Sequence, residues 1–406
     1  MALVPLEEAQ GYVLAACPSL TPVELALGEA LGLVASAQLV AREPVPPFDN
    51  SAMDGFAVRA ADTTLAPVSL AVVGTVAAGD VPSVAIGAGQ AVRIMTGAPV
   101  PPGADAVVMV ERTAAADDGR TVEIRASVTP GTALRWSGDD VHAGDVVAEP
   151  GVELTPGHLG LLASVGVGSV AVFPRARVGV LSTGDELASG PGPLGPGQIR
   201  DSNRPTLLAL VRQAGCQAVD LGTAADDEAA IARAFALATV DCDAVITSGG
   251  VSMGDFDFVK VVLDRLGDMR WMQVAIKPAK PLAFGTVGAT PVFGLPGNPV
   301  SSMVSFELFA RPALRKMMGY PAGRWARPTV PVVAEEALPR ARDGKTHFVR
   351  AVVSMGEDGR YRVRSAGGQG SHQLSAMAGA NALAVLADGD GAPAGAVVEA
   401  MLLHCP

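Results

Sequence analysis

Several loops in the middle third of the sequence combine glycine, hydroxyl, acidic and lysine residues in a pattern suited to an anionic ligand. They are Ser182–Glu186 (STGDE), Ser248–Asp255 (SGGVSMGD), Lys277–Pro281 (KPAKP) and Pro296–Pro299 (PGNP). Glycine-rich turns allow backbone N–H groups to approach an oxyanion, and lysines add positive charge. The start of a following helix adds a partial positive charge. These loops therefore predict a site for a phosphorylated, negatively charged substrate.

Three acidic residues near those loops cannot bind a phosphate directly, because like charges repel. Glu186, Asp226 and Asp257 are instead predicted to hold Mg²⁺, which prefers oxygen ligands and bridges to phosphate oxygens. Asp226, which is followed by Asp227, also fits a plain cap at a helix N-terminus. The chain has 41 Asp plus Glu against 30 Lys plus Arg. An anionic substrate therefore needs local cations or a metal to overcome the general repulsion.

The other loop features also have purely structural interpretations. Gly249 and Gly250 fit an ordinary strand-to-helix turn, and Lys277 and Lys280 fit solvated surface charges. His372 fits a structural turn histidine. The functional interpretation depends on several loops sharing one edge of a sheet, and on no single residue.

A second acidic loop lies far from these in the sequence. Pro46–Gly55 (PPFDNSAMDG) contains Asp54, and Arg93–Ala98 (RIMTGA) ends a predicted strand and contains Thr96. Taken alone, the first loop is also typical of a turn where the chain enters a domain, with Asx side chains capping the backbone. Thr96, taken alone, is more often a turn residue than a ligand.

An alternation of strands and helices must position the loops of the middle third. Short apolar strands are predicted over 177–181, 217–221, 243–247, 272–276 and 291–295. Helices are predicted over about 203–214, from 226 onward, over 255–266 and over 299–318. This order is typical of a doubly wound α/β domain with a parallel sheet, in which ligands bind beyond the carboxyl ends of the strands.

The remaining segments indicate further domains. Residues 45–142 are rich in Val, Gly and Pro and predict a β-rich inserted domain, flanked by helices over 22–40 and 155–164. The C-terminal segment alternates apolar and polar residues and predicts a small β barrel. The predicted domains are a small helical linker domain (22–44 and 143–173), the inserted β domain (45–142), the α/β domain (5–21 and 174–322) and the C-terminal β barrel (323–406).

Composition excludes several classes of protein. No apolar run reaches the roughly 18 residues that a membrane span needs, and the first residues do not resemble a signal peptide, so a cytoplasmic protein with no membrane partner is expected. The absence of a long basic run argues against nucleic acid as a partner. The 4 cysteines and 5 histidines are dispersed, with no C-x-x-C or H-x-x-x-H pair, so no zinc site or disulfide framework is expected.

These motifs, in this order, resemble the molybdopterin molybdenumtransferase family, whose eukaryotic relative is the E domain of gephyrin. The matching stretches run through nearly the whole chain: Phe48–Gly55 (FDNSAMDG), Arg93–Ala98 (RIMTGA), Gly103–Val108 (GADAVV), Ser182–Leu187 (STGDEL), Gln198–Asn203 (QIRDSN), Ser248–Gly254 (SGGVSMG), Lys277–Pro281 (KPAKP), Leu295–Pro299 (LPGNP) and Gly368–His372 (GQGSH). The resemblance implies an elongated homodimer. Each site would lie between the α/β domain of one protomer and the FDNSAMDG-bearing domain of the other.

The resemblance also implies a reaction. Molybdenum from molybdate is inserted into adenylylated molybdopterin, whose dithiolene takes up the metal, and AMP is released with the help of Mg²⁺ or another divalent ion. Transient contacts with a molybdopterin adenylyltransferase and with molybdoenzymes are among the implied partners.

Site residues carry over position by position. The family's functional acids fall on Asp54, Glu186, Asp226 and Asp257, and Thr96 matches another position important for activity. The implied residues that bind the substrates are Ser182, Thr183, Gly184, Asp185, Ser248, Gly249, Gly250, Ser252, Gly254, Lys277, Lys280, Pro296, Gly297, Asn298, Pro299 and Ser371.

Three positions depart from the family pattern. Ala279 stands where the pattern KPGKP has glycine, which questions the close backbone approach expected there. Gln273 stands where some members have a lysine, and this change is expected to weaken anion binding. Asp139 stands where the family has glutamate, and this shorter acid is expected to keep the role.

Two other functions fit parts of the sequence. A molybdopterin adenylyltransferase has a similar α/β domain with a Gly-Gly loop, but lacks the two N-terminal domains and the C-terminal domain expected here. A scaffold like the E domain of gephyrin would bind a receptor peptide between subdomains. The acids argue against a scaffold alone, because a binding module has no need for a metal cluster.

Overall fold

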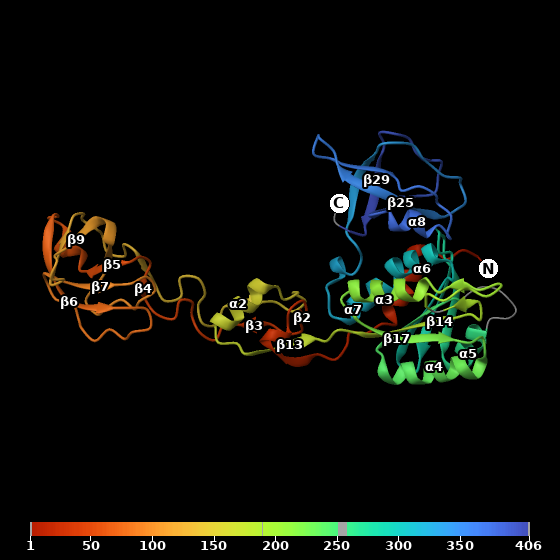
Figure 1. Ribbon diagram of the computed structural model, residues 1–406, viewed down its shortest axis with the longest axis horizontal. Helices are drawn as coiled ribbons and strands as arrows, with labels where there is room; N and C mark the ends of the chain where they lie inside the picture. The colour runs from red at the N-terminus through yellow and green to blue at the C-terminus, as the bar shows by residue number, and fades with distance from the viewer. Residues whose placement is uncertain (1, 189, 251–257, 405–406) are drawn as a thin grey trace.

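The chain is elongated in the computed structural model, which describes residues 2–188, 190–250 and 258–404 (Figure 1). A β domain lies at one end of the long axis and a small linker domain lies in the middle. The α/β domain lies at the other end, with the C-terminal barrel beside it. The described part of the chain contains no helix with the length and apolar character needed to cross a membrane.

The α/β domain is built on a mixed six-stranded sheet. Its strands, in spatial order, are β17 (Gln217–Ala224), β14 (Arg177–Thr183), β18 (Ala244–Ser248), β22 (Thr290–Leu295), β21 (Pro281–Val287) and β19 (Asp268–Gln273). β17, β14, β18 and β22 are parallel, whereas β21 runs antiparallel to both of its neighbours. The doubly wound α/β domain is confirmed, but the prediction of a wholly parallel sheet is wrong. The connections on both sides of β21 contain no crossover helix, and only antiparallel neighbours can be joined in that way.

Helices cover both faces of this sheet. Against one face lie α1 (Leu6–Ala15), α3 (Asn203–Gln213), α6 (Pro299–Ser305), a π-helical turn (Phe306–Ala310) and α7 (Arg311–Met317). Against the other face lie α4 (Glu228–Asp241) and α5 (Phe258–Leu266). The central strands β14, β18 and β22 are almost wholly buried between these two layers of helices, whereas the edge strands β17 and β19 are partly exposed.

The linker domain contains less helix than the sequence predicts. A three-stranded sheet is formed by β1 (Val23–Ala26), β13 (Ser169–Phe173) and β2 (Val34–Ala35), and a second pair by β3 (Leu39–Val40) and β12 (Val146–Ala148). The helix predicted over 22–40 is therefore wrong. Gly28 and Gly32 disfavour a helix there, and the antiparallel partner β13 offers this segment backbone hydrogen bonds that the sequence pattern does not reveal. The helix predicted over 155–164 is present as α2 (Pro156–Ser164), with Thr155 as its cap.

The N-terminal arm ends in a β domain, as predicted. Its six-stranded sheet has the order β8 (Ala106–Met109), β5 (Gly55–Val58), β7 (Gln90–Ile94), β6 (Val68–Val76), β10 (Thr121–Ile124) and β9 (Thr113–Ala115). A short pair, β4 (Asn50–Ser51) and β11 (Leu134–Arg135), closes one end. This domain has its own apolar cores on the two faces of the sheet.

The C-terminal domain is a closed barrel. The strands β25 (Thr346–Met355), β26 (Tyr361–Ser365), β23 (Thr329–Ala334), β29 (Val397–Leu402) and β27 (Ala382–Leu386) form the ring, because β27 pairs back onto β25. Shorter elements are β24 (Leu338–Pro339), β28 (Gly391–Ala392) and α8 (Leu374–Ala378). β20 (Ile276–Lys277), from the α/β domain, pairs in parallel with β25 and attaches the barrel to that domain.

A polar joint fixes the linker domain to the α/β domain. The Arg175 guanidinium donates to Leu31 O at 3.1 Å in the linker domain and to Gly215 O at 3.0 Å in the α/β domain. Arg324, in the segment that leads to the barrel, forms an ion pair with Glu153 of the linker domain at 2.7 Å. We call these contacts the joint, and they set the direction in which the arm leaves the α/β domain.

Candidate functional site

Two strand-end loops meet at the start of α3. The Asn203 side-chain amide donates to Ser248 Oγ and to Gly297 O, both at 2.7 Å. The Gly249 N–H donates to Leu295 O at 3.1 Å, and a Cβ added to Gly297 would lie 3.8 Å from the Gly249 Cα. The loops after β18 and β22 therefore form one continuous surface at the carboxyl edge of the sheet.

The loop after β14 lies beside that surface. Ser182 and Thr183 are buried at the end of the strand, whereas Asp185 and Glu186 are exposed. Gly184 has a φ of 141°, and a Cβ at this position would collide with the Glu186 carboxylate. Glycine is therefore required for the chain to fold back and bring Glu186 toward the sheet edge.

Carboxylates gather where the loops after β14 and β17 approach each other. The Asp226 N–H donates to Asp185 Oδ1 at 3.1 Å. Burial raises the pKa of Asp226, and the nearby charges of Asp185 and Glu186 act in the same direction. Within the described ranges, no three His, Cys, Asp or Glu side chains are grouped closely enough to hold a metal. Asp257, Ser252 and Gly254, also predicted as site residues, lie outside the described residues.

A cavity of about 840 Å³ lies between the α/β domain and the C-terminal barrel. Five of the predicted site residues line it: Lys277, Lys280, Pro296, Asn298 and Ser371. The barrel contributes four cationic or titratable side chains that the sequence did not single out: Arg340, Lys345, His347 and Arg350. Because the loop after β22 lines the cavity and also contacts the loop after β18, the cavity and the strand-end surface are continuous.

Arg350 is the most unusual of these side chains. It is only 1% exposed, and its guanidinium donates to two backbone carbonyls, Gly368 O at 2.8 Å and Gly370 O at 3.2 Å. Its Nε has no hydrogen-bond partner, and burial lowers the pKa of Arg350. No described carboxylate forms an ion pair with Arg350, Lys277 or Lys280. Buried positive charge without a counter-ion is costly, so this wall of the cavity is suited to an anion.

The side chain of Gln369 holds the loop in front of Arg350. Gln369 Oε1 accepts from the Arg350 N–H at 3.0 Å, and Gln369 Nε2 donates to Arg350 O at 3.1 Å. The same loop ends at Ser371, whose carbonyl accepts from the Val300 N–H at 3.1 Å in α6. The GQGSH segment thus connects the barrel to the helix that follows the PGNP loop.

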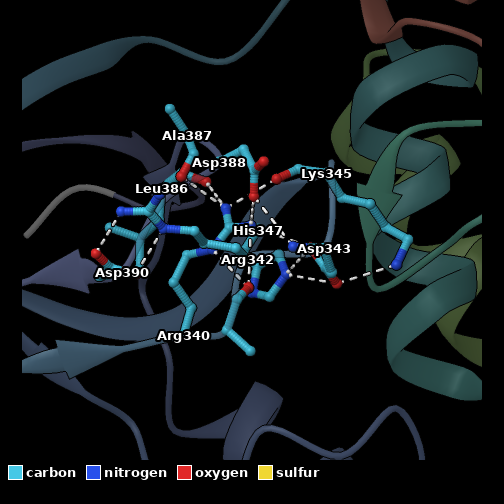
Figure 2. Close-up of polar contacts among 10 residues, drawn as sticks. Arg340, Arg342, Asp343, Lys345, His347, Leu386, Ala387, Asp388 and Asp390 are labelled. Atoms are coloured by element: carbon cyan, nitrogen blue, oxygen red, sulfur yellow. Dashed lines mark hydrogen bonds and ion pairs between the residues drawn. The ribbon is translucent and has the colours of Figure 1, made fainter.

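A second polar cluster lies in the barrel around Arg340 (Figure 2), and its members Arg340, Lys345 and His347 line the cavity. The Arg340 side chain is fully buried and donates to Asp343 Oδ1 at 3.0 Å and Asp388 Oδ1 at 2.6 Å. Asp343 also accepts from Lys345 Nζ at 3.0 Å and contacts His347 Nε2 at 3.1 Å. Arg340 therefore holds the 340–346 loop in the form that places Lys345 and His347 on the cavity wall.

Ala279 adopts the backbone conformation expected of a glycine. Its φ is 75°, in the left-handed region, and it is 3% exposed. This conformation costs an alanine about 1–2 kcal/mol, which the surrounding packing must offset. The substitution of alanine in the KPAKP loop therefore leaves the turn in place, and Lys277 and Lys280 both still reach the cavity.

The predicted residues of the inserted domain form a separate group. The Thr96 N–H and Oγ1–H donate to Asp54 Oδ1 at 2.7 and 2.9 Å. These two hydrogen bonds, the backbone one first, hold the pKa of Asp54 below its ordinary value. Phe48, Met53 and Trp136 on the same domain are 44%, 46% and 47% exposed, which is high for large apolar side chains.

One chain does not bring the two groups together. Asp54 and Thr96 lie on the β domain at one end of the long axis, while the strand-end loops and the cavity lie at the other end (Figure 1). The linker domain separates them. Within one chain the predicted site is therefore divided into two parts.

Comparison with known proteins shows the family to which this chain belongs. Three family profiles match in order: the MoeA N-terminal region (domain I and II) over residues 4–166, a probable molybdopterin binding domain over 179–316, and the MoeA C-terminal region (domain IV) over 332–403. The molybdopterin molybdenumtransferase of Haemophilus influenzae is 41% identical over 95% of this chain and 94% of its own length. The chain belongs to the molybdopterin molybdenumtransferase family.

Other relatives agree with this assignment. Molybdopterin molybdenumtransferase 2 of Mycobacterium tuberculosis is 43% identical over 93% of this chain and 94% of its own length. The crystal structure of a molybdopterin biosynthesis MoeA protein from Pyrococcus horikoshii superposes with a TM-score of 0.82 at 30% identity, covering 100% of both chains. This transferase therefore inserts molybdenum during cofactor biosynthesis, and its fold class matches that of the solved relative. A stand-alone adenylyltransferase does not account for the matches outside the α/β domain.

The barrel side of the cavity is not apparent from the sequence alone. Arg350, Arg340, Lys345 and His347 lie in a segment interpreted only as alternating strand residues. The available signal was an arginine among the apolar residues of β25, because a charged residue in a buried strand needs a partner or a function. The pairing of Lys277 with His347, which brings the two walls together, joins residues 70 positions apart.

Proposed function

We propose that this transferase combines molybdate with adenylylated molybdopterin and releases AMP, in a Mg²⁺-dependent reaction at a site shared by two copies of the chain. The observation that carries the proposal is the cavity of about 840 Å³ with Lys277, Lys280 and Arg350 on its walls. No carboxylate within the described part of the chain neutralises these three cations. A doubly negative substrate would do so, because charge-assisted hydrogen bonds are strongest where solvent is excluded.

Two adjoining compartments suit the two anionic reactants. Molybdate would occupy the cavity, held by Lys277, Lys280, Arg350 and Ser371. The adenylylated pterin would lie along the strand-end loops, where backbone N–H groups and hydroxyls receive its phosphates. The proposed contacts are Ser182, Thr183, Gly184, Asp185, Ser248, Gly249, Gly250, Ser252, Gly254, Pro296, Gly297, Asn298 and Pro299. The loop shared by both compartments would place the dithiolene next to the oxyanion.

The acidic residues are proposed to bind a divalent cation. The raised pKa of Asp226 reflects its burial and its closeness to Asp185 and Glu186, and a bound Mg²⁺ would offset the repulsion among them. Glu186, Asp226 and Asp257 would hold the ion, which would neutralise negative charge on the phosphates of the substrate.

A second copy of the chain would supply Asp54 and Thr96. These two residues lie at the opposite end of the chain from the strand-end loops, so they cannot complete the site of their own chain without a rearrangement of the arm (Figure 1). The exposed Phe48, Met53 and Trp136 on the same domain favour docking against another protein surface. In a two-fold symmetric homodimer each arm would reach the α/β domain of the other chain, which gives two equivalent sites.

The proposed chemistry balances without an external oxidant or reductant. The two thiols of molybdopterin replace one oxygen of molybdate, and their protons leave with that oxygen as water. A second water cleaves the adenylate anhydride and releases AMP. The oxyanion would be held by Lys277, Lys280 and Arg350. Asp54, whose pKa is lowered by the hydrogen bonds from Thr96, would orient the attacking water or the nucleotide.

The reaction also defines the proposed partners and location. The adenylylated substrate has to come from a molybdopterin adenylyltransferase, and the product has to pass to molybdoenzymes. Transient contacts with both, in the cytoplasm, belong to the same proposal.

The test is incubation of the purified transferase with adenylylated molybdopterin, molybdate and Mg²⁺, with AMP measured by chromatography. We expect release of AMP that requires molybdate, and molybdenum that co-purifies with the pterin. Asp54→Asn and Glu186→Gln should each reduce turnover on the order of 10²-fold or more with near-normal folding. Substrate binding without release of AMP would support a scaffold, and adenylylation of molybdopterin by this protein with ATP would support an adenylyltransferase.

A further inference from the structure

His347 lies where the two walls of the cavity join. Its strand β25 pairs in parallel with β20, and His347 is directly opposite Lys277. The imidazole lines the cavity but is only 7% exposed. Nε2 contacts both oxygens of Asp343, at 3.1 and 3.2 Å, which leaves Nδ1 as the nitrogen that can exchange a proton.

The charges that face His347 come from three elements. The 340–346 loop contributes Arg340, Asp343 and Lys345, and β20 contributes Lys277. The segment after β27 contributes Asp388, whose carboxylate is engaged by Arg340 (Figure 2). Around His347 there are thus three permanent cations and two carboxylates, and both carboxylates already accept hydrogen bonds from Arg340.

This environment keeps the imidazole neutral when the cavity holds no anion. Burial lowers the pKa of His347, and repulsion by Arg340 and Lys277 adds to this, while the hydrogen bond to Asp343 opposes it. Asp343 itself stays charged, because hydrogen bonds from Lys345 and His347 outweigh its burial and hold its pKa at about 2. A dianion in the cavity would reverse the balance, since it cancels the repulsion from Lys277 and attracts a proton onto the imidazole.

We propose that His347 is a further oxyanion-binding residue of the cavity, and that it takes up a proton when a tetrahedral dianion such as molybdate binds. This inference rests on the proposed function, in which the cavity holds molybdate. His347 would then add a fourth positive charge beside Lys277, Lys280 and Arg350, and this charge exists only while the anion is present. By linkage, capture of the anion becomes tighter as the pH falls through the range in which the imidazole titrates.

The test is isothermal titration calorimetry of the full-length protein with sodium molybdate between pH 6.5 and 8.5. At each pH the titration is repeated in two buffers that differ in ionisation enthalpy and contain no phosphate, so that the difference in heat gives the number of protons taken up. For the wild type we expect net proton uptake near neutral pH and an affinity that falls by up to about tenfold per pH unit as the pH rises.

Three variants isolate His347. His347→Gln should remove the proton uptake and make the affinity nearly independent of pH. His347→Lys, which carries a permanent charge, should bind as tightly at high pH as the wild type does at low pH. His372→Gln, a change to a histidine close to Ser371 that does not line the cavity, should behave like the wild type. Thermal melting of each variant shows that it is folded, and His347→Lys keeps the test decisive if His347→Gln is unstable.

The outcomes separate this inference from the proposed function. If the wild type binds no molybdate at any pH, the assignment of the cavity fails, and the inference fails with it. If molybdate binds but no proton is taken up, or if His347→Gln takes up as many protons as the wild type, the cavity assignment stands and the role of His347 is wrong.

Discussion

The side-chain amide of Asn203 donates to Ser248 Oγ at 2.7 Å, and this bond joins the first turn of α3 to the end of β18. A second bond from the same nitrogen, to Gly297 O, adds the loop after β22. Asn203 thus positions the edge of the sheet, since one nitrogen atom of its side chain holds together two of the loops that we propose bind the substrate.

Replacement of Asn203 by alanine should therefore cost stability and, separately, turnover. Loss of two hydrogen bonds, of which the one to Ser248 Oγ is partly buried, is expected to lower the free energy of unfolding by about 1–3 kcal/mol. Asn381→Ala is the matched control, because the Asn381 side chain also makes two bonds, to the backbone of Val353 at 2.7 and 2.8 Å in the barrel. Urea denaturation should show similar destabilisation in both variants. The assay of AMP release should show loss of turnover only in Asn203→Ala.

The contact between Thr96 and Asp54 predicts a change in pH dependence. Thr96→Val keeps the backbone N–H bond but removes the hydroxyl bond, so the pKa of Asp54 should rise toward its ordinary value. A group with a lowered pKa is charged above that pKa and loses its charge as the pH falls, so the acid limb of the activity profile should move to higher pH. Turnover should also fall on the order of tenfold, as expected for loss of one charge-assisted hydrogen bond. Thr96→Ser should retain the wild-type profile, and an unchanged acid limb in Thr96→Val would separate Asp54 from catalysis.

A shared site predicts complementation between two inactive variants. Asp54→Asn and Glu186→Gln lie on different parts of the divided site, so a mixed dimer would contain one intact site and one site with both changes. After unfolding and refolding an equal mixture, half of the dimers are mixed, and about a quarter of wild-type activity should return. A mixture of Asp226→Asn and Glu186→Gln is the control, since both residues lie on the α/β domain and no intact site can form. Equal activity in the two mixtures would contradict a site built from two chains.

The buried charge of Arg350 is expected to favour molybdate binding without stabilising the fold. Its charge is buried and no described carboxylate compensates it, so Arg350→Met should leave the free energy of unfolding within about 1 kcal/mol of the wild type, or raise it. Molybdate affinity should nevertheless fall at least tenfold. Arg340→Met, which removes a buried arginine that has two carboxylate partners, should be strongly destabilising by comparison. A destabilised Arg350→Met with wild-type affinity would show that Arg350 is structural.

The left-handed backbone at Ala279 predicts a stabilising substitution. Ala279→Gly should raise the free energy of unfolding by about 0.5–1 kcal/mol, because glycine adopts a φ of 75° without the steric cost of a Cβ. Ala283→Gly in β21, where the alanine is fully buried in a regular strand, should have the opposite sign. Thermal unfolding of both variants provides the comparison.

Strongly apolar strands were the part of the fold that the sequence predicted best. The segments around β14, β18 and β22 are short apolar runs followed by glycine-rich loops, and local composition alone identifies them. The segment Val23–Ala26 was predicted as helix because its apolar spacing fits a helix. Its strand partner β13 lies about 145 residues later, so its pairing could not be read from local pattern.

The residues of the candidate site fall into the same two groups, those that local sequence reveals and those that depend on contacts with distant segments. Lys277 and Lys280 stood out because two lysines flank a tight loop, and both line the cavity. Arg350 and His347 did not stand out, because their significance depends on burial and on neighbours from β20 and the 340–346 loop. The separation of Asp54 from Glu186 within a chain follows from the length of the arm, which the family resemblance implied but the local residue pattern does not show.

The joint formed by Arg175 and the Arg324–Glu153 pair lies at the base of the long arm that carries the β domain. A rotation of given size at the joint displaces the β domain in proportion to the length of the arm. A small change at these polar contacts would therefore move Asp54 away from the α/β domain that it is proposed to reach. Substitutions at the joint would therefore misplace Asp54, the carboxylate proposed to act in the shared site, as effectively as its direct removal. In the proposed homodimer, substitutions at the joint would also change the fit between the two protomers without altering any residue proposed to contact the reactants.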